Sequence, residues 1–282
     1  MPVPLMFRVT VALLFALVLG GCASHAPAPQ LWDLWTAHNE QDRKPLDNRE
    51  WAAFLQRYAK TGSDGITRVA YGAVTHEDME RLGAWLRLMQ QMDVSELNLR
   101  EQRAYWLNLY NAEVVRLVLV HYPLDSVDAL QPPWWKRWWP GVQGPFAEPL
   151  LEVDGQALSL DDIENHILRP RWLDPRTVYL LCKARLGSPP LAPQPYAAEY
   201  LDEQIEAQAR RWVNGPYALR IDAHGRLRVA ELYRRYRSDF GDEAAVLAQL
   251  RRYAAPPLAA QLAKVDGIHG YIDDRRLNDA AD

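Results

Sequence analysis

The stretch from Arg100 to His121 constrains the fold more than any other part of the chain. Its spacing predicts one long helix that stops at Tyr122-Pro123, because proline disfavours the helical conformation of the preceding residue. Apolar side chains surround the predicted helix axis instead of forming one stripe, which indicates burial on most sides. We therefore expect a globular protein that packs around this helix.

Two amides interrupt the apolar surface of that helix. Asn108 and Asn111 lie one turn apart, and a buried amide without partners costs about 1–3 kcal/mol. Each side chain should therefore be hydrogen-bonded, and we expect the partner to be loop backbone. Residues in the wall of a pocket and clamps that hold a loop would give the same sequence pattern, so both interpretations stay open.

The other predicted elements are shorter. Thr75 with Asp78, and Ser159 with Asp162, are typical of helix N-termini, and Pro170 should end the second of these helices. Further predictions are a buried strand over 177–182, helices over 199–213 and 244–253, and hairpins over 151–158 and 219–229. Few strands among many helices indicate an α+β fold: a single, mostly helical domain over residues 46–282, with a small β-sheet and hairpins.

The N-terminus has the features of an export signal. Residues 1–21 hold one basic side chain and then an apolar run that is too short to span a bilayer stably. Leu19-Gly20-Gly21-Cys22 resembles the lipobox of bacterial lipoproteins, which implies a cleaved signal peptide and a lipidated Cys22. Residues 22–45 would then hold the lipidated cysteine and a tether, because Ala23 to Gln30 is small and proline-rich.

The same resemblance implies an address. In lipoproteins a residue other than Asp after the cysteine favours the outer membrane, and here that residue is Ala23. We expect a lipid-anchored protein of the bacterial outer membrane, on the periplasmic face, with the membrane as a partner.

Composition argues against several other classes of protein. The 282 residues include 32 basic and 36 acidic side chains, a formal charge of −4, and the basic residues are scattered, which argues against nucleic-acid binding. Two cysteines, Cys22 and Cys182, exclude a disulfide scaffold. His121, His166, His224 and His269 lack ligand spacing, so we expect no metal and no cofactor.

Four tryptophans lie between Trp134 and Trp139. If exposed, such a cluster could contact membrane headgroups or sugars, since indole joins an apolar body to one polar N–H. A long loop folded over the core is the alternative.

Several runs together resemble the family called domain of unknown function 547. They are residues 101–112 (Glu-Gln-Arg-Ala-Tyr-Trp-Leu-Asn-Leu-Tyr-Asn-Ala), 121–123, 158–164 and 167–170, with 71–74 upstream and 233–241 and 277–278 downstream. The resemblance covers roughly residues 46–279. It implies no established reaction.

The chain departs from that family where a Cys/His set is usual. An ungapped alignment over residues 179–187 puts Val178 at the family's histidine position, and Lys183 and Ser188 at its two cysteine positions. Arg185 replaces the family's serine. Cys182 stands one residue away from the family position.

Two hypotheses follow. In the first, the domain has lost the Cys/His set and binds a ligand or a protein partner without catalysis. In the second, it is a hydrolase or transferase with Ser188 or Cys182 as nucleophile and His166 or Glu164 as base.

A candidate pocket is common to both hypotheses, with the members Asn108, Asn111, Arg169, Lys183 and Arg185. Convergence of its cations would suit a carboxylate or phosphate group. The alternative is that Lys183 and Arg185 are solvated or paired with acids such as Glu164.

Overall fold

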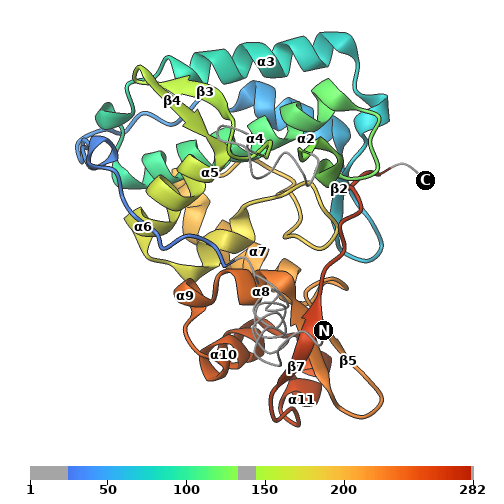
Figure 1. Cartoon of the computed structure of the whole chain (residues 1–282). Coiled ribbons are helices and arrows are strands. Elements are labelled where there is room, and N and C mark those ends of the chain that lie inside the picture. Colours follow the sequence, from blue (N-terminus) through green and yellow to red (C-terminus); the bar gives the residue numbers. More distant parts are fainter. Residues whose placement is uncertain (1–24, 133–143, 281–282) are drawn as a thin grey trace, which may run out of the picture.

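The protein is mostly helical, with short strands at its edges (Figure 1). The computed structural model describes residues 25–132 and 144–280. Its longer helices are α2 (Arg49–Tyr58), α3 (His76–Gln90), α4 (Leu99–His121), α7 (Leu201–Val213) and α10 (Glu243–Tyr253). Shorter ones are α5 (Leu160–Asp162), α6 (Arg169–Trp172), α8 (Glu231–Arg235), α9 (Arg237–Phe240) and α11 (Pro256–Leu262).

The strands form small sheets. Antiparallel pairs join β1 (Ala59–Thr61) to β2 (Thr67–Val69) and β3 (Pro149–Val153) to β4 (Gln156–Ser159). In a three-stranded sheet, β6 (Leu227–Ala230) pairs antiparallel with β5 (Leu219–Ile221) and parallel with β7 (Ile268–Ile272). These elements confirm the predicted mostly helical α+β class.

The predicted central helix is α4. The Asn98 side chain accepts hydrogen bonds from the backbone N–H groups of Arg100 and Glu101, which satisfies donors that a helix start otherwise leaves free. Nearly every residue from Glu101 to Val118 is buried, as the all-round apolar pattern predicted.

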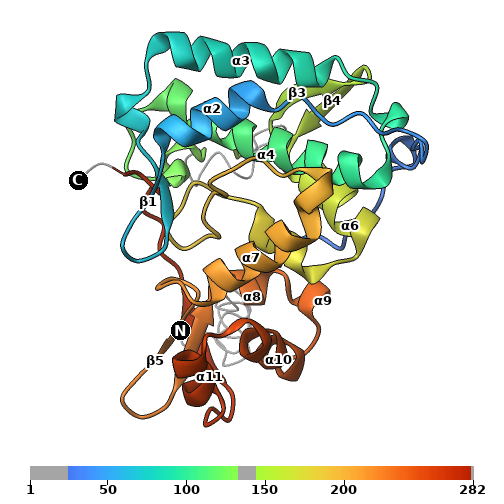
Figure 2. The ribbon, with the colours of Figure 1, turned by 180° about the vertical axis from the view of Figure 1, so that it is seen from behind.

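Two hydrophobic clusters make up the core. One gathers side chains of α2, α3, α4 and the β3–β4 hairpin, and the other gathers those of α7, α8, α10 and the three-stranded sheet. Figures 1 and 2 show α2, α3, α4 and the β3–β4 hairpin above α7, and α8, α10 and the three-stranded sheet below it. Cavities between such clusters are common ligand sites.

The strand predicted over 177–182 is wrong. Residues Pro175–Leu180 form a 3-10 helix, η6, whose Asp174 side chain accepts from the Arg176 N–H. Val178 and Tyr179 enter the second cluster, whereas Leu180 and Leu181 enter the first. The apolar run is therefore continuous because it lies between two cores, not because it is a strand in a sheet.

The prediction that Pro170 ends its helix is also wrong. Ser159 forms a reciprocal capping box with Asp162, as predicted, and the helix then widens into a π-helix, η5 (Ile163–Leu168), before α6. A proline normally leaves the carbonyl four residues earlier without a donor. Here the Trp32 N–H donates to the carbonyl of His166 at 3.2 Å, so the helix continues to Trp172.

The donor Trp32 belongs to a segment that we call the N-terminal strap, residues 26–36. The Ala26 N–H donates to the Arg235 carbonyl at 2.8 Å, and the Gln30 N–H donates to the Asn165 carbonyl at 3.0 Å. Trp35 is buried against Trp106, with ring centroids 4.9 Å apart. The predicted tether is therefore not free over residues 26–30: backbone hydrogen bonds hold this segment to the domain, and the Ala26 side chain is buried in the second cluster.

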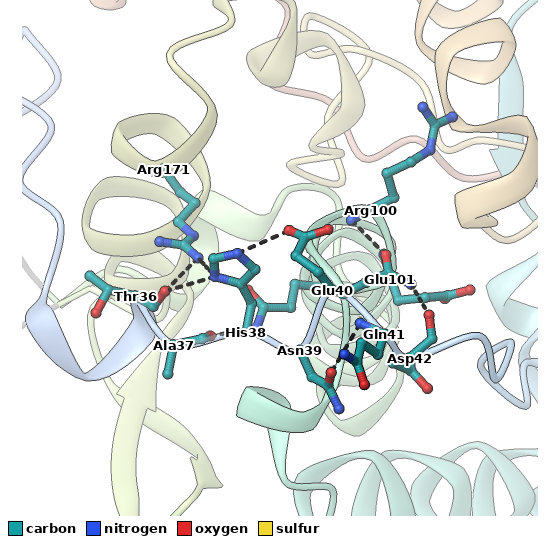
Figure 3. Close-up of polar contacts among 12 residues, drawn as sticks. Thr36, Ala37, His38, Asn39, Glu40, Gln41, Asp42, Arg100, Glu101 and Arg171 are labelled. Atoms are coloured by element: carbon teal, nitrogen blue, oxygen red, sulfur yellow. Dashed lines mark hydrogen bonds and ion pairs between the residues drawn. The ribbon is translucent and has the colours of Figure 1, made fainter.

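Figure 3 shows how the chain continues past the strap. Arg171 on α6 donates to the Thr36 carbonyl at 2.7 Å and lies 3.2 Å from His38 Nδ1, while His38 Nε2 is 2.9 Å from a Glu40 oxygen. In Figure 1 this dark blue segment runs along α6 before it reaches α2.

Near the end of the described chain, Leu277 and Asn278 are buried. Asn278 accepts from the Tyr71 hydroxyl at 2.9 Å, and its side-chain amide approaches the Cys182 sulfur at 3.4 Å. Within residues 25–132 and 144–280, no helix is both long and apolar enough to cross a bilayer.

Candidate functional site

The two amides of α4 are clamps on the loop that follows η6. Asn111 donates to the carbonyls of Leu107 and Leu180 and accepts from the Cys182 N–H, with distances of 2.8 to 2.9 Å. Asn108 donates to the Tyr196 carbonyl and accepts from the Tyr196 N–H, both at 2.8 Å. Both side chains are buried. The prediction that loop backbone satisfies them is confirmed.

The loop between the clamps turns tightly at Gly187. The Gly187 N–H donates to the Asp274 carbonyl at 2.8 Å, and a Cβ atom here would lie 2.5 Å from the Asp274 nitrogen. Only glycine allows this approach. The turn fixes the direction in which Lys183, Arg185 and Ser188 point.

These side chains line a cavity of about 540 Å³ between the two clusters, which we call the central cavity. Ligand pockets commonly have volumes of roughly 300–1,000 Å³. Its charged lining residues are Lys183, Arg185, Arg234, Arg235 and Arg275, with the acids Asp161, Glu164, Glu231 and Asp273. Tyr236, Phe146 and Ser188 also line it.

A buried ion pair forms one wall. Lys183 contacts Glu164, whose side chain is 2% exposed, and the ammonium also lies 5.2 Å from the centre of the Tyr110 ring and 5.3 Å from that of Phe146. Burial alone would raise the pKa of Glu164, but the attraction of Lys183 keeps that pKa below its usual value. Both groups are therefore charged and mutually neutralised.

The other cations of the lining are mostly paired as well. Arg185 contacts Asp128, Arg234 contacts Glu231, and Arg275 lies 2.7 Å from an Asp273 oxygen. The alternative that Lys183 and Arg185 are paired with acids is therefore the correct one.

Three donors of the lining lack such a partner. Arg235 has no carboxylate within 4.0 Å in the described parts of the chain, and its guanidinium lies 5.8 Å from the centre of the Tyr236 ring. The buried Tyr236 hydroxyl and Arg185 Nε also have no hydrogen-bond partner within 3.5 Å there. Burial and the nearby Glu164 carboxylate both raise the pKa of Tyr236, so this hydroxyl keeps its proton. Buried donors without partners are costly, so these groups favour a ligand with acceptor atoms.

One acid of the lining is also unpaired. Asp161 has no cation within 4.0 Å among residues 25–132 and 144–280. Burial raises its pKa, and the neighbouring Glu164 adds to that effect, while Lys183 and Arg235 oppose it. Among the described residues, the cavity therefore holds one cation and one carboxyl group without an ion-pair partner.

Cys182 does not have the surroundings of a nucleophile. Its sulfur is buried and accepts from the Ala184 N–H and the Asn278 amide, each at 3.4 Å. Burial raises the pKa of this thiol to about 11. A reactive cysteine needs a lowered pKa, since the thiolate is the nucleophile.

Ser188 and His166 are not brought together by their hydrogen bonds. The Ser188 hydroxyl donates to the Arg185 carbonyl at 2.8 Å and accepts from the Lys183 N–H. The His166 ring instead stacks on Trp32 with centroids 4.6 Å apart, and its Nδ1 lies 2.9 Å from the Gln30 carbonyl. Glu164, the other candidate base, is held by Lys183.

The candidate pocket assembles only in part. Lys183 and Arg185 line the central cavity, but Asn108, Asn111 and Arg169 do not. Arg169 is paired with Asp239 through two hydrogen bonds of 2.6 Å and also donates to the Pro27 carbonyl. Its role is to hold the strap and α9 together.

The sequence prediction missed Arg235 and Tyr236. Both belong to the Tyr-Arg-Arg-Tyr run at 233–236, which carried part of the family resemblance. The adjacent Arg234 and Arg235 were the sequence signal that could have pointed to this wall of the cavity. Nothing local shows that α8 packs against a loop fifty residues earlier in the chain.

Two of the sequence predictions fall on residues that the structure does not describe. Trp134 to Trp139 lie outside the described residues, as does Cys22. No group of three or more His, Cys, Asp or Glu side chains in residues 25–132 and 144–280 could hold a metal ion.

Comparison with the curated proteins and with the solved structures gives no match. One family model does match, and its limits coincide with structural elements: the match begins at Val94, where a 3-10 turn precedes α4, and ends at Val213, the last residue of α7. Helix α8 lies beyond it. Residues 94–213 thus match the family model described as "Protein of unknown function, DUF547".

Proposed function

We propose that the protein is a cell-envelope lipoprotein, anchored through Cys22 to the outer membrane, whose central cavity binds a small anionic ligand without catalysis. The observation that carries the binding proposal is Arg235, a guanidinium in the cavity wall with no carboxylate partner among the described residues. The anchor rests on the Leu19-Gly20-Gly21-Cys22 sequence.

The surroundings of Arg235 support an anion rather than a neutral ligand. The other four cations of the lining are already paired with acids, so an anion that contacted only those ion pairs would gain little binding free energy. Arg235, Tyr236 Oη and Arg185 Nε offer donors to acceptor atoms. Phosphate and carboxylate groups carry such atoms and suit a planar guanidinium.

The absence of catalysis is proposed from the nucleophile candidates. The Cys182 thiol is buried with a raised pKa, and the Ser188 hydroxyl is engaged with loop backbone. Neither has His166 as a hydrogen-bond partner, because that ring is bonded to Gln30.

Calorimetric titration of the full chain in maltoside detergent tests the binding proposal. Inorganic phosphate and succinate serve as probes, with Arg235→Gln as the variant and Arg237→Gln, at an exposed arginine on α9, as the control. A hydrogen bond to a charged group contributes about 1.5–3 kcal/mol, so Arg235→Gln should weaken binding at least tenfold. Equal affinity in both variants, or no binding at all, would refute the proposal.

Covalent probes test the second part. A fluorophosphonate and iodoacetamide should leave Ser188 and Cys182 of the folded protein unlabelled. Stoichiometric labelling that is lost in His166→Ala would instead establish a hydrolase or transferase.

A further inference from the structure

The strap begins to contact the domain very close to the proposed lipid anchor. Ala26 is fixed through its N–H to the Arg235 carbonyl, and the Pro27 carbonyl accepts from Arg169 at 3.0 Å. Cys22 precedes Ala26 by four residues. A chain spans at most about 3.3–3.6 Å per residue, so an acylated Cys22 would hold Ala26 within roughly 14 Å of the bilayer surface.

The residue to which Ala26 is bonded lines the central cavity. Arg235 offers its backbone carbonyl to the strap and its guanidinium to the cavity wall. The anchor would therefore place this wall at the level of the lipid headgroups. A diffusing solute needs no such placement, whereas a lipid headgroup does.

The charges of the cavity select among headgroups. Arg235 and the Tyr236 hydroxyl offer donors for a phosphate. The Asp161 carboxyl, which has no cation within 4.0 Å in the described parts of the chain, suits an ammonium group. A headgroup that carries both a phosphodiester and an ammonium, as phosphoethanolamine does, would satisfy the donors and the acid together.

We propose that the central cavity binds the zwitterionic headgroup of a membrane phospholipid, with its phosphate on Arg235 and Tyr236 and its ammonium on Asp161. This inference rests on the proposed function, since it needs both the Cys22 anchor and the cavity as a binding site. It adds the class of ligand and a reason for the short link between Cys22 and Ala26.

Native mass spectrometry of the lipidated full chain from maltoside micelles tests the ligand class. We expect one phosphatidylethanolamine to stay bound and phosphatidylglycerol, which lacks the ammonium, to bind at least fivefold less. Tyr236→Phe should lower occupancy about tenfold without loss of stability, because the removed hydroxyl has no partner in the described residues. Asp161→Asn should abolish the preference between the two lipids.

Free phosphoethanolamine distinguishes a lipid from a soluble ligand. If it binds in a Tyr236-dependent manner while neither lipid is retained, the cavity is a solute site, so the inference falls and the proposed function stands. If neither lipids nor phosphoethanolamine nor inorganic phosphate binds, both fall. Equal lipid occupancy in wild type and Tyr236→Phe would place the lipid outside the cavity and overturn the inference.

The length of the link provides an independent test. A 20-residue Gly/Ser insertion between Ser24 and His25 lengthens the link from Cys22 to Ala26 from four residues to 24. The effective concentration of the cavity at the membrane surface falls roughly as the −3/2 power of link length, so it should drop about 15-fold. In galactolipid vesicles with dilute phosphatidylethanolamine, hydrogen exchange in residues 231–236 should lose its lipid-dependent protection. Unchanged protection would contradict the role of the short link.

Discussion

Replacing Asn111 by Leu tests how α4 holds the loop of the candidate site. The side chain has similar volume but no polar atoms, so the Leu180 carbonyl and the Cys182 N–H lose their partner in a buried environment. The Leu107 carbonyl keeps its helical hydrogen bond. Two orphaned groups cost about 1–3 kcal/mol each, and the added apolar burial offsets part of this, which leaves a net loss of about 2–4 kcal/mol.

Urea unfolding followed by circular dichroism measures this loss as a lower midpoint at unchanged slope. Gln91→Leu is the matched control, because Gln91 is an exposed amide at the C-terminal end of α3, and its effect should stay within about 0.5 kcal/mol. A change in Asn111→Leu no larger than that of the control would refute the reasoning that the amide is a required clamp.

Three further predictions concern single side chains. Cys22→Ser should move the protein from the membrane to the soluble periplasmic fraction, and a variant that still fractionates with membranes would contradict the anchor. The Cys182 thiol, with a pKa of about 11, should react with iodoacetamide at mildly alkaline pH only after unfolding in guanidinium chloride, as mass spectrometry would detect. Glu164→Gln leaves the Lys183 ammonium buried without its partner and should cost about 3–5 kcal/mol, while Glu164→Gln combined with Lys183→Met should recover most of that loss in denaturant unfolding. The folded pKa of Glu164 lies below its unfolded value. Its contribution to the free energy of unfolding is therefore complete above the unfolded pKa and disappears as pH falls through the folded pKa. A Glu164→Gln variant with an unchanged acid unfolding profile would contradict this.

The local signals of the sequence predicted local structure well. Ser159 with Asp162 placed a capping box, and the all-round apolar pattern placed α4 at the centre, because both follow from neighbours along the chain. The run at 177–182 was misassigned, since a short apolar stretch is buried equally well in a strand or between two cores. Pro170 was misjudged because the donor that replaces its N–H comes from Trp32, far away in sequence.

The sequence predicted only one wall of the candidate site. The departures from the family pattern pointed to Lys183, Arg185 and Ser188, which do line the central cavity. The opposite wall, with Arg235 and Tyr236, depends on how the second cluster packs against the first, and no spacing in the sequence encodes that distance. Arg169 was grouped with the pocket from its charge alone, whereas Asp239 holds it elsewhere.

The hydrogen bonds of Asn278 make three distant segments of the chain depend on one another. Val69 N–H donates to the Asn278 carbonyl, Ala184 accepts from the Asn278 N–H, and the side chain joins Tyr71 to Cys182. Segments near residues 70, 183 and 278 thus satisfy one another's buried polar groups. Deleting residues 277–280 should therefore destabilise the first core cluster and not only the end of the chain, because buried donors and acceptors of the other two segments would lose their partners.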